Sequence, residues 1–97
     1  MKNRHRFVVI TAAAINRFGV SMAVPVTSGG LLPRELGLVV AISGHDTSGV
    51  AVCNQVRSFD IEARLRDGSA RYVETLDEGT TGEIVSRVVS VIDPEEF

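Results

Sequence analysis

The sequence VSMAVPVTSGG, residues 20–30, joins an apolar run to a loop of hydroxyl and glycine residues. The run from Val20 to Val24 predicts a β-strand rich in apolar residues. Pro25 is expected to end the strand's hydrogen-bond ladder, because proline has no N–H to donate. Thr27 and Ser28 then present two hydroxyls ahead of two glycines, which let another group approach the backbone closely. The end of a buried strand is a common place for functional groups.

Apolar runs on both sides of this stretch predict the other strands of a sheet. The expected strands cover residues 6–11, 20–24, 38–42, 50–57 and 70–73. A loop is expected over residues 31–36, where Pro33 interrupts the apolar run. Turn-forming residues from Ser43 to Gly49 lie between two of these strands and predict a hairpin connection. Short helical turns are expected near residues 12–15 and 60–65, with a break at Asp67 and Gly68.

The end of the chain carries the clearest helix pattern. Thr80 and Glu83 fit a capping box, in which each side chain bonds a backbone N–H of the other's residue. Apolar residues then recur at helical spacing at Ile84, Val85, Val88, Val89 and Ile92. This stripe is expected to pack on the end of the sheet, and Pro94 should stop the helix. The prediction is a mainly β fold, a small curved antiparallel barrel or half-barrel with a C-terminal helix, forming one domain over residues 1–97.

Composition limits the classes of protein to which the chain can belong. With 97 residues, 44% of them apolar, there is room for one hydrophobic core. No apolar run approaches the roughly 18 residues that a membrane span requires, and no secretory signal pattern follows the basic start. A soluble cytoplasmic protein without a membrane partner is expected. The single cysteine, Cys53, is expected in the core, and one cysteine with two distant histidines supplies no metal-ligand set.

Charge is distributed unevenly along the chain. The net charge of −2 is unlike the strongly basic character of general nucleic-acid binders. Residues 1–57 nevertheless carry six basic and two acidic side chains, a balance of +4, whereas the remainder carries four arginines and ten acids, a balance of −6. This asymmetry allows a local face that attracts phosphate on an acidic protein.

Four segments resemble, in the same order, the MazF/PemK family of toxin endoribonucleases. They are the connector AINRFG at residues 14–19, the turn Pro25-Val26-Thr27, the strand GVAVCNQVRS at residues 49–58, and Ala63-Arg64. The resemblance implies the SH3-like barrel of MazF, Kid and CcdB toxins, working as a homodimer. It also implies sequence-specific cleavage of single-stranded RNA without metal or cofactor, and a cognate antitoxin as partner. Family members begin with a further strand and a loop ending in Glu-Gln, and Met1 falls where that loop ends.

The resemblance also implies the catalytic residues. The family uses the threonine of its Pro-x-Thr turn, which Thr27 matches, and an arginine just before the second strand. Strict register places His5 at that arginine and Arg6 at the following proline. Two candidates for the cationic or acid–base group therefore remain open. Arg6 would supply a permanent charge that grips phosphate through two hydrogen bonds, and His5 would act as general base or acid.

Further side chains are candidates for RNA contacts. The amides of Asn54 and Gln55 can bond base edges in single-stranded RNA, and Arg57 can meet a phosphate or stack on a base. Ser28 and Arg4 complete the candidate RNA-binding set. A different function remains open: a truncated relative that only binds antitoxin or dimerises, or a CcdB-like protein that binds gyrase. The absent first strand and the histidine at position 5 favour this alternative.

Overall fold

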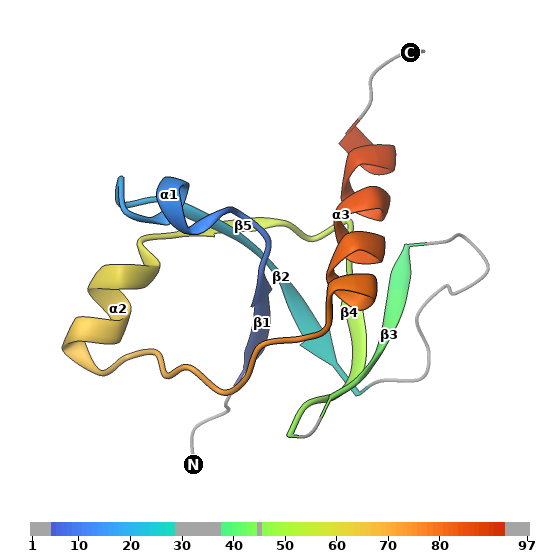
Figure 1. Ribbon diagram of the computed structural model, residues 1–97, viewed down its shortest axis with the longest axis horizontal. Helices are drawn as coiled ribbons and strands as arrows, with labels where there is room; N and C mark the ends of the chain where they lie inside the picture. Colours follow the sequence, from blue (N-terminus) through green and yellow to red (C-terminus); the bar gives the residue numbers. More distant parts are fainter. Residues whose placement is uncertain (1–4, 29–37, 45, 93–97) are drawn as a thin grey trace.

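A single antiparallel sheet with a helix over one face forms the body of the protein (Figure 1). The computed structural model describes residues 5–28, 38–44 and 46–92. The strands are β1 (Arg6–Val9), β2 (Ser21–Thr27), β3 (Val39–Ser43), β4 (Ser48–Val52) and β5 (Arg57–Phe59). The helices are α1 (Ala13–Asn16), α2 (Ile61–Asp67) and α3 (Glu78–Ile92). The expected mainly antiparallel fold with a C-terminal helix is confirmed, and the sheet is open.

Strand β2 is the centre of the sheet. The strand order is β1-β2-β4-β3, and β5 also pairs with β2. One edge of β2 pairs with β1, while the other edge pairs first with β5, over Ser21–Ala23, and then with β4, over Val26–Thr27. β2 therefore holds three strands together and delivers Thr27 at its end.

The expectation that Pro25 ends the ladder is wrong, because β2 continues through it to Thr27. Pro25 lies opposite Phe7 of β1. The Ile10 N–H donates to the Met22 carbonyl at 2.9 Å, so the alternation of an antiparallel pair points the backbone groups of Val24 and Val26 toward β1. Pro25 then faces the other edge, at the place where β5 has ended and β4 has not begun. Its missing N–H costs no ladder bond there.

The hydrophobic core lies between one face of the sheet and α3. Its buried members are Val24, Val40, Ile42, Ala51, Cys53, Ile84 and Val88. Cys53 is fully buried, which confirms its expected place in the core. Only Ile84 and Val88 of the predicted helical stripe are buried, since α3 rests mainly against β3. Val85, Val89 and Ile92 are exposed.

Two of the predicted strands differ from the structure. The strand expected from Val50 to Arg57 ends at Val52, a turn follows at Cys53 and Asn54, and β5 begins at Arg57. The strand expected from Ala70 to Val73 is wrong, since residues 70–77 form neither strand nor helix. Strand-forming side chains such as Tyr72 and Val73 make a strand only beside a partner, and no described strand lies next to them.

The predicted start of the terminal helix is also wrong. The helix begins at Glu78, and Asp77 is its N-cap: the Thr80 N–H donates to Asp77 Oδ2 at 2.9 Å. Asp60 caps α2 in the same way, and Gly68 ends α2 in the left-handed conformation, at the predicted break. The expected loop at residues 31–36 and the stop at Pro94 lie outside the described residues.

Candidate functional site

Thr27 is the last residue of β2 and is held at its end by β4. It lies opposite Val50 in the β2–β4 register, and its side chain is half-buried. The neighbouring Gly49 has φ +128°, and a Cβ there would lie 2.5 Å from the Thr27 carbonyl oxygen. Glycine is required at position 49 by both its conformation and this close approach. The backbone of Thr27 is therefore fixed by contact with the β4 backbone.

His5 directly precedes β1, and Thr27 is the last residue of β2. The β1–β2 register ends with the pair of Arg6 and Val26, so His5 and Thr27 each lie one residue beyond this pair, at the same end of the two strands. His5 is exposed. The register thus brings two of the three predicted catalytic residues to the same end of the β1–β2 pair.

Arg6 points to the face of the sheet opposite that of Thr27, because alternate residues of a strand face opposite ways. Its Nη1 donates to the Asp46 carbonyl oxygen at 2.6 Å and to Thr47 Oγ1 at 2.8 Å. Thr47 is 7% exposed, so this bond satisfies a buried hydroxyl. The Arg6 guanidinium therefore holds the β3–β4 hairpin. The structure does not bring it to the face that carries Thr27.

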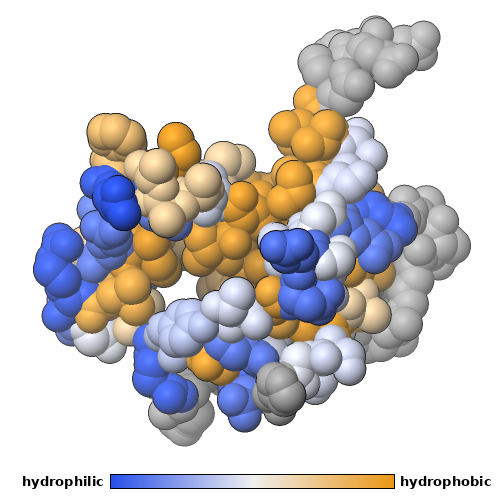
Figure 2. Space-filling model, viewed as in Figure 1, coloured by the Kyte–Doolittle hydropathy of each residue, from blue (hydrophilic) through white to orange (hydrophobic). Residues whose placement is uncertain are grey.

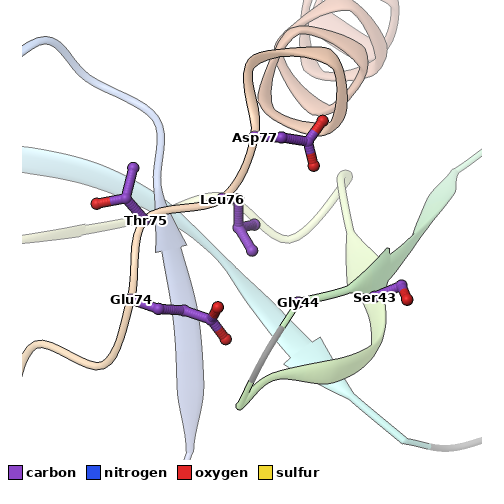
Figure 3. Close-up of a pocket in the computed structure, with 6 residues that line it drawn as sticks. All are labelled: Ser43, Gly44, Glu74, Thr75, Leu76 and Asp77. Atoms are coloured by element: carbon purple, nitrogen blue, oxygen red, sulfur yellow. The ribbon is translucent and has the colours of Figure 1, made fainter.

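The segment before α3 holds the same hairpin from its other side. The Asp46 N–H donates to Glu74 Oε2 at 2.8 Å, and Gly44 N–H donates to the Thr47 carbonyl. Figure 3 shows the Glu74 carboxylate extending toward Gly44, where a Cβ would lie 2.8 Å from Glu74 Oε2. The backbone of Asp46 is thus bound at two atoms. Its carbonyl oxygen accepts from Arg6, and its N–H donates to Glu74. Sequence reasoning missed this tie, because it joins residues far apart in the chain.

A pocket of about 280 Å³ lies between the hairpin and the segment before α3 (Figure 3). It is lined by Ser43, Gly44, Glu74, Thr75, Leu76 and Asp77. Hydrogen bonds from the side chain and backbone N–H of Thr80 lower the pKa of Asp77, which keeps that carboxylate charged. Two carboxylates at one small pocket disfavour an anionic ligand, so this pocket is unsuited to an RNA phosphate.

The predicted RNA-binding residues are spread along the sheet. Asn54 and Gln55 are exposed in the turn after β4, and Ser28 is exposed directly after β2. Arg57 lies opposite Ala23, on the face of Thr27 but four residues further along β2, roughly 13 Å at 3.3 Å per residue. Arg4 lies outside the described residues. These side chains do not gather at one point around Thr27.

An aromatic pair shares the face of Thr27 and was not singled out from the sequence. Phe7 and Phe59 meet edge to face with ring centroids 5.0 Å apart. The Arg64 guanidinium lies 5.0 Å from the centre of the Phe59 ring. Aromatic and guanidinium planes are the groups on which single-stranded bases stack. The sequence signal for Arg64 is the segment Ala63-Arg64, one of the four that resemble the MazF/PemK family.

Among residues 5–28, 38–44 and 46–92, no three histidine, cysteine or acidic side chains are placed to share a metal ion. In the same part of the chain, no helix has the length and apolar character to cross a bilayer.

Comparison with known proteins decides the family. The sequence model of the PemK-like, MazF-like toxins of type II toxin-antitoxin systems matches residues 1–92. The chain belongs to this family. The match covers every strand and helix that the structure describes, so the resemblance found in the four segments between residues 14 and 64 is confirmed.

Individual members of the MazF/PemK family support the same assignment. Endoribonuclease PemK of Escherichia coli is 33% identical over 87 residues, which cover 87% of this chain and 62% of that protein. Endoribonuclease toxin ChpB of Escherichia coli strain K12 is 30% identical, over 88% of this chain and 72% of that protein. The chain thus spans about 62% of the length of PemK.

Solved structures of the family share the fold. In a MazE–MazF crystal structure from Deinococcus radiodurans, the matching chain has a TM-score of 0.74 and 26% identity, covering 92% of this chain and 82% of its own length. MazF alone from the same organism gives a TM-score of 0.75 at 24% identity, over 95% of this chain and 79% of that one. The second likeness concerns the fold alone.

Proposed function

We propose that this protein is the toxin of a type II toxin-antitoxin pair and an endoribonuclease that cuts single-stranded RNA at specific sequences without a metal ion. Family membership supports the toxin role, and the relatives PemK and ChpB are named as endoribonucleases. The observation that carries the proposal is that His5 and Thr27 lie at the same end of the β1–β2 pair, each one residue beyond the pair of Arg6 and Val26. An acid–base group and a hydrogen-bond donor would then meet at this end of the sheet.

The proposed reaction is transfer of the phosphate to the neighbouring 2′-oxygen. A base removes the 2′-hydroxyl proton, the 2′-oxygen bonds to phosphorus, and the bond from phosphorus to the 5′-oxygen breaks. The 5′-oxygen takes a proton, which leaves a 2′,3′-cyclic phosphate on one product and a 5′-hydroxyl on the other. Thr27 donates a hydrogen bond to a phosphate oxygen and holds the group for in-line attack. His5 moves the proton, since an imidazole serves as base or acid near neutral pH.

Arg6 and His5, the two candidates for the cationic or acid–base group, have different roles in this proposal. Arg6 is held by Asp46 and Thr47 on the other side of the sheet, where it fixes the β3–β4 hairpin. His5 lies at the end of the β1–β2 pair that carries Thr27, so we assign the reacting position to His5. Arg6 acts through the hairpin and is a positioning residue. In this proposal an imidazole takes the position that a guanidinium holds in the family.

RNA is proposed to follow the face that carries Thr27 along β2 toward β5. The Phe59 ring with Arg64 above it offers a stacking surface, and Arg57 offers a cation for the phosphate backbone. The amides of Asn54 and Gln55 are exposed beyond the end of β4 and would read base edges. Ser28, exposed directly after Thr27, and Arg4 complete the proposed set of RNA contacts.

The proposed partners are a second copy of the chain and a cognate antitoxin. MazE–MazF complexes from Deinococcus radiodurans supply the precedent for an antitoxin. A homodimer is proposed on the family resemblance. Both proposals concern the chain in the cytoplasm, where its RNA substrate would be found.

Cleavage of a labelled single-stranded RNA in the presence of EDTA tests the proposal. Thr27→Ala should abolish cleavage while leaving the thermal unfolding midpoint unchanged within error, whereas Thr27→Ser should retain part of the activity because it keeps the hydroxyl. Ser86→Ala is the control, since it removes an exposed hydroxyl from α3, away from the proposed RNA path, and should retain full activity. Full cleavage by the Thr27→Ala variant would remove Thr27 from the mechanism.

The second candidate is a module that binds without cutting. Histidine at the position of the family's arginine is the observation that favours it, because the imidazole lacks the permanent charge of a guanidinium. A folded protein that fails to cleave RNA but binds antitoxin would support this function. Inhibition of gyrase instead would indicate the CcdB-like role.

A further inference from the structure

The β3–β4 hairpin contacts both strands whose ends carry the proposed reacting residues. In its turn, the Asp46 carbonyl oxygen accepts a hydrogen bond from Arg6, the residue that directly follows His5. In β4, Gly49 lies so close to β2 that a Cβ at this position would be 2.5 Å from the Thr27 carbonyl oxygen. The hairpin therefore links the end of β1 to the end of β2, and a shift of the hairpin would move these two ends relative to each other.

The position of His5 depends on how its neighbour Arg6 is held. The described β1–β2 register ends at the pair of Arg6 and Val26, so His5 lies one residue beyond the ladder. The Arg6 guanidinium is held by the Asp46 carbonyl oxygen at 2.6 Å and by Thr47 Oγ1 at 2.8 Å. Phosphate transfer is sensitive to such placement, because misplacing a reacting group by about 1 Å can slow a reaction by about a hundredfold.

Glu74 binds the same residue of the hairpin as Arg6. Its Oε2 accepts a hydrogen bond from the Asp46 N–H at 2.8 Å. The carboxylate lies against Gly44, where a Cβ would be 2.8 Å from Oε2 and 2.9 Å from Oε1 (Figure 3). The glycine at position 44 therefore lets the carboxylate reach the Asp46 N–H, and Asp46 is held at both of its backbone polar atoms.

The bond between Glu74 and Asp46 lies at a polar surface. Glu74 belongs to residues 70–77, which connect α2 to α3 and form neither strand nor helix (Figure 1). Figure 2 shows mainly hydrophilic colouring along this segment, and the bond itself is exposed. Since water can replace the partner of an exposed group, loss of this bond should change stability little. An effect of Glu74 on a reaction can therefore be separated from an effect on folding.

We infer, resting on the function proposed above, that Glu74 is a positioning residue for RNA cleavage. Its carboxylate holds the hairpin through Asp46, so that His5 and Thr27 keep the separation that the reaction requires. Glu74 acts on the placement of the reacting groups and not on the binding of RNA. Its removal should therefore lower the rate at saturating RNA and leave the half-saturating RNA concentration nearly unchanged.

Single-turnover cleavage of a labelled single-stranded RNA by the full chain, in EDTA, tests this inference. Glu74→Ala should lower the maximal rate by about tenfold or more, with a half-saturating RNA concentration within about twofold of the parent's. Glu74→Gln keeps an acceptor oxygen and should retain most of the rate. Glu78→Ala is the matched control, since it removes an exposed carboxylate from the first turn of α3 and should leave the rate unchanged. An unchanged rate in Glu74→Ala, or an equal loss in Glu78→Ala, would overturn the inference.

Gly44→Ala displaces the carboxylate without changing Glu74. The new Cβ would meet the far end of a flexible side chain, and the φ of Gly44 is not positive, so the fold should remain while the carboxylate leaves the Asp46 N–H. This variant should lose as much of the maximal rate as Glu74→Ala, and the double variant should lose no more than either alone. Additive losses would overturn the inference. If Glu74→Ala does not fold, Gly44→Ala decides.

NMR spectroscopy separates this inference from the proposed function. The imidazole signals of His5 and the methyl signal of Thr27 should shift in Glu74→Ala and Gly44→Ala, and they should stay in place in Glu78→Ala. If the signals shift but the parent cuts no RNA, the proposed function fails, while the placement of His5 and Thr27 by Glu74 stands. If the parent cuts RNA but the signals do not shift, the positioning role of Glu74 is overturned, while the proposed function stands.

Discussion

Arg6 of β1 and Thr47 of the β3–β4 hairpin are joined by a 2.8 Å hydrogen bond from Nη1 to Oγ1. In the strand order β1-β2-β4-β3, β1 lies at one end. The bond connects it to a buried hydroxyl in the hairpin of β3 and β4, at the other end. The same nitrogen also donates to the Asp46 carbonyl. Arg6, which the sequence suggested as a phosphate-binding residue, thus holds the β3–β4 hairpin in place.

Arg6→Ala should lower the free energy of unfolding by about 1–2 kcal/mol, because it leaves the buried Thr47 hydroxyl without its donor. Urea unfolding followed by circular dichroism measures the change. Arg17→Ala is the matched control, since Arg17 is exposed and its removal should change stability by less than about 0.5 kcal/mol. Equal effects of the two substitutions would contradict a structural role for Arg6.

Gly49→Ala should destabilise the protein by about 2 kcal/mol or more, because φ +128° is unfavourable for alanine and the new Cβ would meet the Thr27 carbonyl. The control is Gly82→Ala in α3, where an added Cβ contacts nothing within 4 Å. That change should stabilise the protein by roughly 0.5–1 kcal/mol through helix propensity. Opposite signs in thermal unfolding are expected, and a neutral Gly49→Ala would show that the strands can separate at no cost.

Asp77 should make α3 sensitive to acid. Its pKa in the folded state is lowered by the Thr80 hydrogen bonds, so its contribution to stability is present above the unfolded-state pKa and is lost as pH falls through the lower folded value. Asp77→Asn keeps an N-cap but should flatten this part of the stability–pH curve, whereas Asp77→Ala should lower the unfolding midpoint at neutral pH as well. Unfolding midpoints between pH 2 and 7 measure both effects. If the unfolding midpoint of Asp77→Asn falls with pH as it does in the parent, other carboxylates cause the acid sensitivity.

Cys53 should be unreactive in the folded protein. Burial raises the pKa of its thiol, with Glu83 adding to the rise and Arg87 opposing it, so less thiolate is present at any given pH. A disulfide reagent such as DTNB at pH 8 should react slower by about two orders of magnitude than with the urea-unfolded chain. Rapid labelling under native conditions would mean that the core opens readily around β4.

His5→Gln should lower the rate of RNA cleavage by about a hundredfold or more, because an amide cannot move the proton that the mechanism assigns to the imidazole. His5→Arg supplies a cation without an acid–base group and should also cleave more slowly than the parent. An unchanged rate in His5→Gln, measured on the same labelled RNA, would exclude His5 from proton transfer. Thermal unfolding of each variant serves as the control for folding.

Local patterns predicted much of the fold. The turn formers from Ser43 to Gly49 placed the hairpin, and Asp67 and Gly68 marked the end of α2. The Pro25 prediction failed because the effect of a proline depends on which edge its missing donor faces. That direction is fixed by pairing with β1 and by the handover from β5 to β4, which no local pattern contains.

The candidate site was partly accessible from the sequence. Matching to the family positions singled out Thr27 and His5, and the structure places Thr27 at the end of β2 and His5 directly before β1, at the same end of the two strands. The bonds of Arg6 to Asp46 and Thr47 join residues some 40 positions apart, so spacing along the chain gave no indication of them. The start of α3 was predicted wrongly because both Asp77 and Thr80 are residue types that cap helices. In the structure Asp77 is the N-cap, so the helix begins at Glu78.

The central position of β2 has a consequence for how the chain folds. Its pairings with β4 and β5 join residues that are distant in sequence, whereas the β3–β4 hairpin closes over a few residues. Closing a long loop costs more conformational entropy than closing a short one. The β3–β4 hairpin is therefore expected to form early, and β2 is expected to pair with β4 and β5 late. A slow step in refolding kinetics should therefore respond to substitutions in β2 more than to those in the hairpin.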